Sequence, residues 1–137
     1  MFAKEVAEAL SPRLVSRDFT LTQEVVGGPM GSASFRFSSE IVNIDIQSDR
    51  EKLDITVGPI GDHSYGFVVW AKLLGVSASE LTSFDDQIEF FMEHLDAIIR
   101  AVRDDRLIDE RLRDLNWVLV KEHLGLDPDQ PRPGAST

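Results

Sequence analysis

The chain has 137 residues, and its 24 aspartates and glutamates against 14 lysines and arginines give a formal net charge of −10. This length suits one domain, and the negative charge disfavours binding to a nucleic-acid backbone, which needs cationic side chains. The absence of cysteine excludes disulfides and thiolate chemistry, and no apolar run approaches the roughly 20 residues that span a bilayer. The N-terminal segment carries Glu5 and Glu8 and lacks the continuous apolar core of a signal peptide, so we expect a cytoplasmic protein.

The N-terminal segment predicts one short helix followed by one strand. Residues 2–10 place apolar side chains on one side of a helix and charged side chains on the other. Pro12 either ends this helix or starts a further turn. Residues 18–26 are rich in threonine and valine and alternate loosely, which favours a strand. The glycine-rich segment 27–31 is then a connection, because it lacks the Gly-Lys-Ser/Thr of a phosphate loop and precedes a strand.

Residues 32–60 alternate apolar and polar side chains with a period of two, which predicts half-buried antiparallel strands with one wet face. Two short turns, around residues 39–40 and 49–50, set the pairing. This register keeps all the apolar side chains on one face, and a one-residue slip would destroy that agreement. The expected pairs are Phe35 with Ile44, Phe37 with Val42, Ile46 with Leu53, Ile44 with Ile55 and Val42 with Val57.

The strands are followed by an apolar helix. Residues 58–64 form a turn cluster, in which Asp62 or Ser64 is a candidate helix cap. Residues 65–74 are apolar nearly all round, and Gly75 stands where a C-terminal glycine belongs. This helix is therefore expected to be the most buried one.

Two further helices and a tail complete the chain. A helix begins at Phe84 with a sharp apolar seam and breaks near residues 103–106. A second seam predicts a last helix over residues 106–124. The segment 127–137 has three prolines and no large apolar residue, which indicates a disordered tail. The sequence thus predicts one α+β domain over residues 1–126, with an N-terminal helix, a four-stranded antiparallel β-meander and three helices packed on one sheet face.

The usual catalytic and metal-binding motifs are absent from the sequence. None of His63, His94 and His123 lies in a His-Glu-x-x-His pattern, and no serine lies in a Gly-x-Ser-x-Gly elbow. Asp62, His63 and Ser64 are consecutive, and three consecutive residues rarely converge as a triad does. We therefore expect no metal, no cofactor and no catalytic residue, although carboxylates and a histidine from distant segments could still converge.

Two carboxylates face each other on the predicted wet face of the sheet. The register above places Asp45 directly opposite Asp54, with Arg36 diagonal to Asp45. Like charges in this position destabilise a sheet. The pair is either two solvated carboxylates that splay apart, or an acid/base site, a cation site or a patch that contacts basic side chains.

The helix that starts at Phe84 carries an acidic ridge, which we define as Asp85, Glu89, Glu93 and Asp96. Their spacings of 4, 4 and 3 place them along one line away from the apolar seam. Within the sequence only Asp96 has a well-placed partner, Arg100, four residues on. The ridge is either a solvated helix face or a docking surface that a cationic partner neutralises.

Three segments give the chain a resemblance to known proteins. The run FRFSSEIVNIDIQSDREKLDITVGPIGD, the apolar helix that begins at SYGF and the long acidic helix resemble small bacterial proteins of the polymorphic-toxin immunity type, over about residues 32–102. This resemblance implies a non-catalytic protein that binds and blocks one toxin, often a basic nuclease. The helix–meander–helix order is also similar to bacterial secretion chaperones, which hold a partner segment against a sheet or helix groove.

Three functions follow in order of preference. The first is a binding module that captures a basic protein through the acidic ridge and the face of Asp45 and Asp54. The second is a secretion-chaperone-like subunit that forms a homodimer. The third is a small enzyme that uses Asp45, Asp54 and one histidine. Neither nucleic acid nor a membrane is an expected partner.

Overall fold

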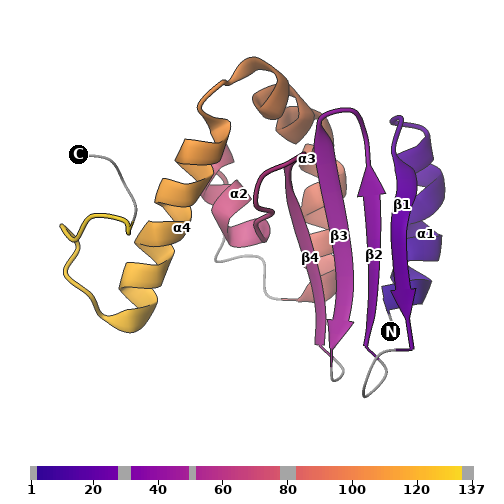
Figure 1. Cartoon of the computed structure of the whole chain (residues 1–137), viewed down its shortest axis with the longest axis horizontal. Coiled ribbons are helices and arrows are strands. Elements are labelled where there is room, and N and C mark those ends of the chain that lie inside the picture. The colour runs from indigo at the N-terminus through magenta and orange to yellow at the C-terminus, as the bar shows by residue number, and fades with distance from the viewer. Residues whose placement is uncertain (1–2, 28–31, 50–51, 78–82, 134–137) are drawn as a thin grey trace.

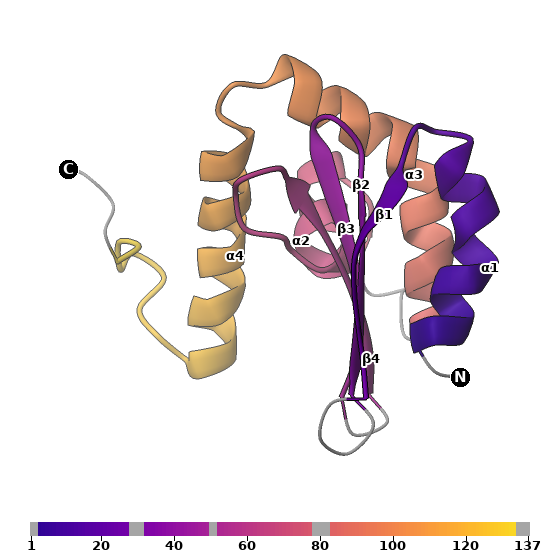
Figure 2. The ribbon, with the colours of Figure 1, turned by 45° about the vertical axis from the view of Figure 1, so that its right-hand side comes forward.

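The computed structural model describes residues 3–27, 32–49, 52–77 and 83–133. It is an α+β fold in which one helix precedes an antiparallel four-stranded meander and three helices follow it, as the sequence predicts. Figures 1 and 2 show α1 and α3 side by side on one face of the sheet. The elements are α1 (Ala3–Val15), β1 (Thr20–Val26), β2 (Ala33–Ser38), β3 (Val42–Asp49), β4 (Lys52–Pro59), α2 (Phe67–Leu74), α3 (Phe84–Asp104) and α4 (Ile108–Leu124).

The four strands pair in chain order, and the alternating apolar side chains of β2, β3 and β4 are buried or half-buried on the face that the helices cover, whereas every residue of β1 is exposed. The predicted register was wrong by two residues in both hairpins. Phe37 lies opposite Ile44, where Val42 was expected, and Ile46 lies opposite Ile55, where Leu53 was expected. A shift by an even number of residues leaves every side chain on its predicted face, so the alternation could not distinguish the two registers.

The position of each turn explains the difference in register. The Ser39 hydroxyl accepts hydrogen bonds from the backbone N–H groups of Ile41, at 3.4 Å, and Val42, at 3.1 Å. The backbone N–H of Ser39 also donates to the carbonyl of Val42, so the first turn lies one residue later than predicted. In the second hairpin the pairing continues to Asp49 opposite Lys52. Residues 50–51, and residues 28–31 of the predicted β1–β2 connection, lie outside the described residues.

At Val57 the β4 edge of the sheet is bridged by the segment that leads into α2. Val57 and Tyr65 exchange two backbone hydrogen bonds of 2.9 Å, as in an antiparallel bridge. Trp70 of α2 is fully buried, and its indole N–H donates to the carbonyl of Val57 at 2.8 Å. α2 therefore starts at Phe67 after Gly66, and the predicted cap by Asp62 or Ser64 was wrong because the Tyr65 bridge delays the helix.

The opposite edge, β1, lies open. All seven of its residues are exposed, including the apolar Leu21, Val25 and Val26. The pairing of β1 with β2 is irregular between Leu21 and Gln23, where the register shifts. An exposed strand edge offers unpaired backbone groups to another chain.

The other helices begin and end close to the predicted positions. α1 continues through Pro12 to Val15, which agrees with the alternative that Pro12 adds a turn. Ser83 caps α3, because its hydroxyl accepts the backbone N–H of Asp86 at 3.1 Å. Gly75 and Gly125 end α2 and α4 in the left-handed conformation that favours glycine.

α4 takes a different position from the one expected for it. It packs on α2 beyond the β4 edge, whereas α3 packs on the sheet beside α1 (Figure 1). Its seam begins with the buried Ile108 and Leu112. After Gly125 the chain turns back along α4, so the described part of the tail, residues 127–133, contacts this helix. The prediction of disorder for residues 127–137 stays a prediction. No helix among the described residues has the length and apolar character to cross a membrane.

Tyr65 is nearly buried between the β4 edge and α4, and this gives a testable consequence. Burial raises the pKa of Tyr65, the negative charge of Asp109 raises it further, and Arg113 acts in the opposite direction. Because the folded-state pKa is raised, this group's contribution to stability is complete below the ordinary tyrosine pKa and is lost as the pH rises through the folded-state value.

Tyr65 is the only tyrosine of the chain, so tyrosinate absorbance reports its titration alone. We expect a higher titration midpoint in the native protein than in urea. Equal titration midpoints in the native protein and in urea would contradict the burial of Tyr65. The variant Tyr65→Phe gives the background absorbance.

Candidate functional site

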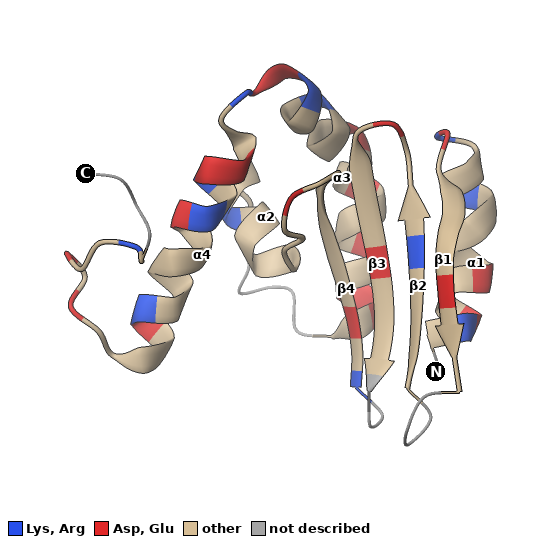
Figure 3. Cartoon of the chain, in the orientation of Figure 1, with Lys and Arg blue, Asp and Glu red and all other residues tan. Residues whose placement is uncertain are grey.

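The acidic ridge lies on the outer face of α3. Phe91, Leu95 and Ile98 of the same helix are buried, which turns the ridge outward. Asp85, Glu89 and Glu93 are exposed, and no ion pair to them is present among the described residues. The only lysines or arginines of α3 lie near its C-terminal end, at the top of Figure 3. The N-terminal half of α3 therefore presents carboxylates without cations of its own.

The fourth ridge residue, Asp96, has a cation, but a different one from the predicted partner. Its Oδ1 lies 3.2 Å from Nε of Arg17, which follows α1, and the expected pair with Arg100 is not formed. The packing of α1 beside α3 places Arg17 at the ridge, and no sequence spacing reveals such a contact. The Asp96 side chain is 71% exposed, so this pair contributes little to stability. Three carboxylates of the ridge thus remain available to a partner.

Asp45 and Asp54 do not face each other, and that prediction was wrong. Because of the two-residue change in register, Asp45 lies opposite Thr56 on β4, and Asp54 lies opposite Gln47. On its other side Asp45 lies directly opposite Arg36 of β2, which was expected on the diagonal. The pair of carboxylates that an acid/base site would need is therefore not formed in this register.

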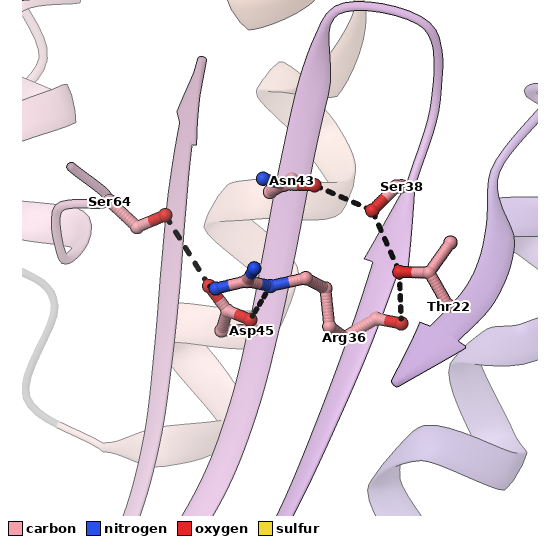
Figure 4. Close-up of polar contacts among 6 residues, drawn as sticks. All are labelled: Thr22, Arg36, Ser38, Asn43, Asp45 and Ser64. Atoms are coloured by element: carbon pink, nitrogen blue, oxygen red, sulfur yellow. Dashed lines mark hydrogen bonds and ion pairs between the residues drawn. The ribbon is translucent and has the colours of Figure 1, made fainter. Parts of the chain in front are cut away.

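Asp45 is instead the buried centre of a partly buried polar cluster (Figure 4). The guanidinium of Arg36 donates to both carboxylate oxygens of Asp45, at 2.7 and 3.3 Å, and the Ser64 hydroxyl donates to Oδ2 at 3.4 Å. The Asp45 side chain is 7% exposed, against 42% for Arg36. The hydrogen bond with Asp45 and the charge of Asp45 raise the pKa of Arg36. A buried carboxylate that its own arginine neutralises is not available to another protein's cations, so we assign Asp45 a structural role.

A second chain of hydrogen bonds continues across the same face of the sheet. The hydroxyls of Thr22 and Ser38 are 2.9 Å apart, and Ser38 donates to Oδ1 of Asn43 at 2.5 Å. These contacts join β1, β2 and β3 (Figure 4). Polar groups that are satisfied in this way rigidify a sheet. Asp54, in contrast, is exposed near the N-terminal end of β4 and makes no ion pair among the described residues.

No group of three histidines or carboxylates that could hold a metal ion occurs among the described residues. The ring of His94 packs against that of Phe90, with centroids 4.7 Å apart. Within the predicted turn 58–64, the hydroxyl of Ser64 donates a hydrogen bond to Asp45, and the backbone of His63 lies against Gly58. This turn therefore has a structural role.

The structure also forms a cleft that the sequence did not predict. It has a volume of about 540 Å³ and lies where the ends of α1 and α3 meet the β2–β3 turn. Arg17 and Arg103 line it together with the acidic Asp18 and Glu40, so its charges offset one another. Its residues come from separate segments, and no spacing along the chain could have grouped them. The balanced charge indicates no class of ligand.

Comparisons with protein-family models, curated protein sequences and solved structures found no match to this chain. The resemblance to immunity-type proteins over residues 32–102 therefore stays a prediction. The geometry of the acidic ridge and of the two sheet edges carries the functional argument.

Proposed function

We propose that this protein is a non-catalytic binding module that captures a basic surface of a partner protein in the cytoplasm, as an immunity-type inhibitor does. The observation that supports this most strongly is the exposure of Asp85, Glu89 and Glu93 without a cation from the described residues. Like charges at helical spacing destabilise a helix, and only Asp85 and Asp86 in the first turn gain from the helix dipole. Lysines or arginines of a partner would remove the repulsion between Glu89 and Glu93.

The electrostatic character of this surface predicts how binding would depend on salt. Complementary charges accelerate the encounter of two proteins more than they increase raw affinity. Salt screens exposed charges over about 8 Å at physiological ionic strength. Association through the ridge should therefore be fast at low salt and slow markedly as salt is added.

The test reverses charge at the centre of the ridge. The double variant Glu89→Lys/Glu93→Lys should associate with the basic partner about tenfold more slowly at low salt, and its rate should depend less on salt. The partner is first captured on immobilised wild-type protein, and association is then measured by surface plasmon resonance. The matched control is Glu5→Lys/Glu8→Lys, which makes the same change in net charge on α1. If both variants slowed association equally, the effect would be one of net charge alone, and the ridge would not be part of the interface.

The open β1 edge supports a second candidate, a secretion-chaperone-like subunit that holds a strand of a partner or pairs with a second copy. Leu21, Val25 and Val26 are exposed there, whereas the β4 edge is bridged at Val57 by Tyr65. Strand addition supplies backbone hydrogen bonds along such an edge. Sedimentation over a range of concentrations separates the two candidates, because a stable dimer that Val25→Lys dissociates would favour the second one.

A further inference from the structure

Two consecutive turns bring the tail back onto α4. Gly125 ends the helix with a φ of 67°, and the backbone N–H of Leu126 donates back into the last helical turn at 2.9 Å. In the second turn the backbone N–H of Gln130 donates to the carbonyl of Asp127 at 3.0 Å, and the Asp127 carboxylate accepts the N–H of Asp129 at 3.0 Å. An aspartate followed by a proline favours such a turn. The reversal is therefore encoded locally, in the tail itself.

Two side chains of α4 hold this turn in place. The indole N–H of Trp117 donates to the carbonyl of Gln130 at 2.9 Å, and the Lys121 ammonium donates to the carbonyl of Pro128 at 2.6 Å. Figures 1 and 2 both show the segment returning beside α4. Because both hydrogen bonds go to main-chain carbonyls, they fix the path of the tail and direct the residues that follow toward the first half of the helix.

Arg132 is the charged contact of the tail. Its guanidinium donates to the carboxylate of Asp114 at 3.1 Å and to that of Glu110 at 3.5 Å. The Arg132 side chain is only 17% exposed, although both carboxylates are more than half exposed. Burial raises the pKa of Tyr65, and the positive charges of Arg113 and Arg132 lower it. Arg132 therefore lies close enough to Tyr65 to act on it, and it connects the tail, α4 and the segment that bridges β4.

The helix under the tail is attached to the rest of the fold by few buried side chains. Only Ile108 and Leu112 of α4 are buried. Asp109 and Arg113, whose charges also act on Tyr65, form an ion pair of 2.9 Å. One carboxylate oxygen of Asp109 and the Nε of Arg113 are buried without a hydrogen-bond partner among the described residues. Unpaired buried polar atoms weaken an interface, so we expect α4 to open locally before the sheet does.

Tyr65 lies where these contacts meet the sheet. Its backbone exchanges two hydrogen bonds of 2.9 Å with Val57, and its side chain is only 8% exposed. We propose that residues 125–133 are a strap that locks α4 over Tyr65 through Arg132, so that the strap, α4 and the bridge to β4 open together as one unit. A strand edge that loses its bridge offers unpaired backbone groups to another strand, so the strap controls access to the β4 edge. This device does not depend on the acidic ridge or on the function proposed above.

The test follows amide hydrogen exchange of the full-length chain by NMR, under conditions in which the opening equilibrium sets the rate. In the wild type, the amides inside α4 and those of Val57 and Tyr65 should share one opening equilibrium and open more often than the amides of β3. The variant Arg132→Gln removes the charged contact of the strap, so it should speed exchange in α4 and at the bridge by the same factor, about tenfold. If Val57 and Tyr65 opened only together with β3, the bridge would not belong to the unit and the proposal would be wrong.

Two further variants separate the strap from an effect of net charge. The double variant Glu110→Gln/Asp114→Asn removes both acceptors of Arg132 and should speed the same amides, although it changes the net charge in the opposite direction. Adding Arg132→Gln to it should have no further effect, because the contact is already lost. The matched control is Arg100→Gln, at an exposed arginine of α3 that makes no ion pair among the described residues, and it should leave these rates unchanged.

Three results would overturn the proposal. They are unchanged exchange in Arg132→Gln, faster exchange in α4 without any change at the bridge, and equal effects of Arg132→Gln and Arg100→Gln. Circular dichroism shows that each variant remains folded.

Discussion

Replacing Trp70 with alanine is expected to lower the free energy of unfolding by about 3–5 kcal/mol. Trp70 is fully buried where α2 meets the sheet, so the substitution removes the largest side chain of the core and leaves a cavity. It also removes the hydrogen bond from the indole to the carbonyl of Val57. That carbonyl keeps the backbone N–H of Tyr65, so the main loss is packing.

The chain provides a matched control for this prediction in its second tryptophan. Trp117 lies half-exposed on α4, and its indole N–H binds only the tail. Urea unfolding followed by circular dichroism should show a much smaller loss for Trp117→Ala than for Trp70→Ala, and an intermediate loss for Trp70→Phe. If the two alanine variants were equally stable, the placement of Trp70 in the core would be wrong.

Replacing Gly58 with alanine is expected to cost about 1–3 kcal/mol through overpacking. A Cβ atom at this position would lie 2.3 Å from the carbonyl oxygen of His63 and 2.7 Å from the Cα of Ser64. Both are backbone atoms, so neither can move without displacing the loop that returns over β4. Displacement of this loop would weaken the hydrogen bond from Ser64 to Asp45 and the bridge between Tyr65 and Val57.

The control for the prediction at Gly58 is Gly66→Ala. Gly66 has a φ of −75°, and a Cβ atom there would meet no atom within 4 Å. Its replacement should change stability by less than about 0.5 kcal/mol, as is usual for open surface positions. Amide hydrogen exchange should show faster exchange at Val57 and Tyr65 in Gly58→Ala than in the wild type. Similar stability and similar exchange in both glycine variants would show that the loop does not lie against Gly58.

Much of the fold followed from the periodicity of the sequence. The alternation over residues 32–60 predicted which side chains of the meander face the core, and it also predicted their antiparallel order. It did not predict the register, because an even shift preserves the alternation and the choice depends on a turn that the Ser39 hydroxyl closes. The position of α4 was not predictable either, because its seam is equally suited to a sheet or to another helix.

The candidate site was only partly predictable, because local spacing reports contacts within one helix. The spacing identified the acidic ridge, but it assigned Asp96 to Arg100 when the cation comes from Arg17, 79 residues away in the sequence. The error at Asp45 came from the register, which places Thr56 of β4 where a carboxylate was expected and brings Arg36 of β2 from the diagonal to the directly opposite position. The contact between Arg132 and α4 depends on a reversal of the chain after Gly125, which sequence periodicity does not encode.

The unequal edges of the sheet limit how molecules of this protein can assemble. A strand that added along the whole length of β4 would have to displace Tyr65 from Val57, whereas all of β1 is exposed. Growth into a continuous fibre needs two free edges on every molecule, one to receive a neighbour and one to continue. When two copies join through β1, each keeps only the edge that Tyr65 bridges at Val57, so strand pairing over a full-length edge is expected to stop at a pair.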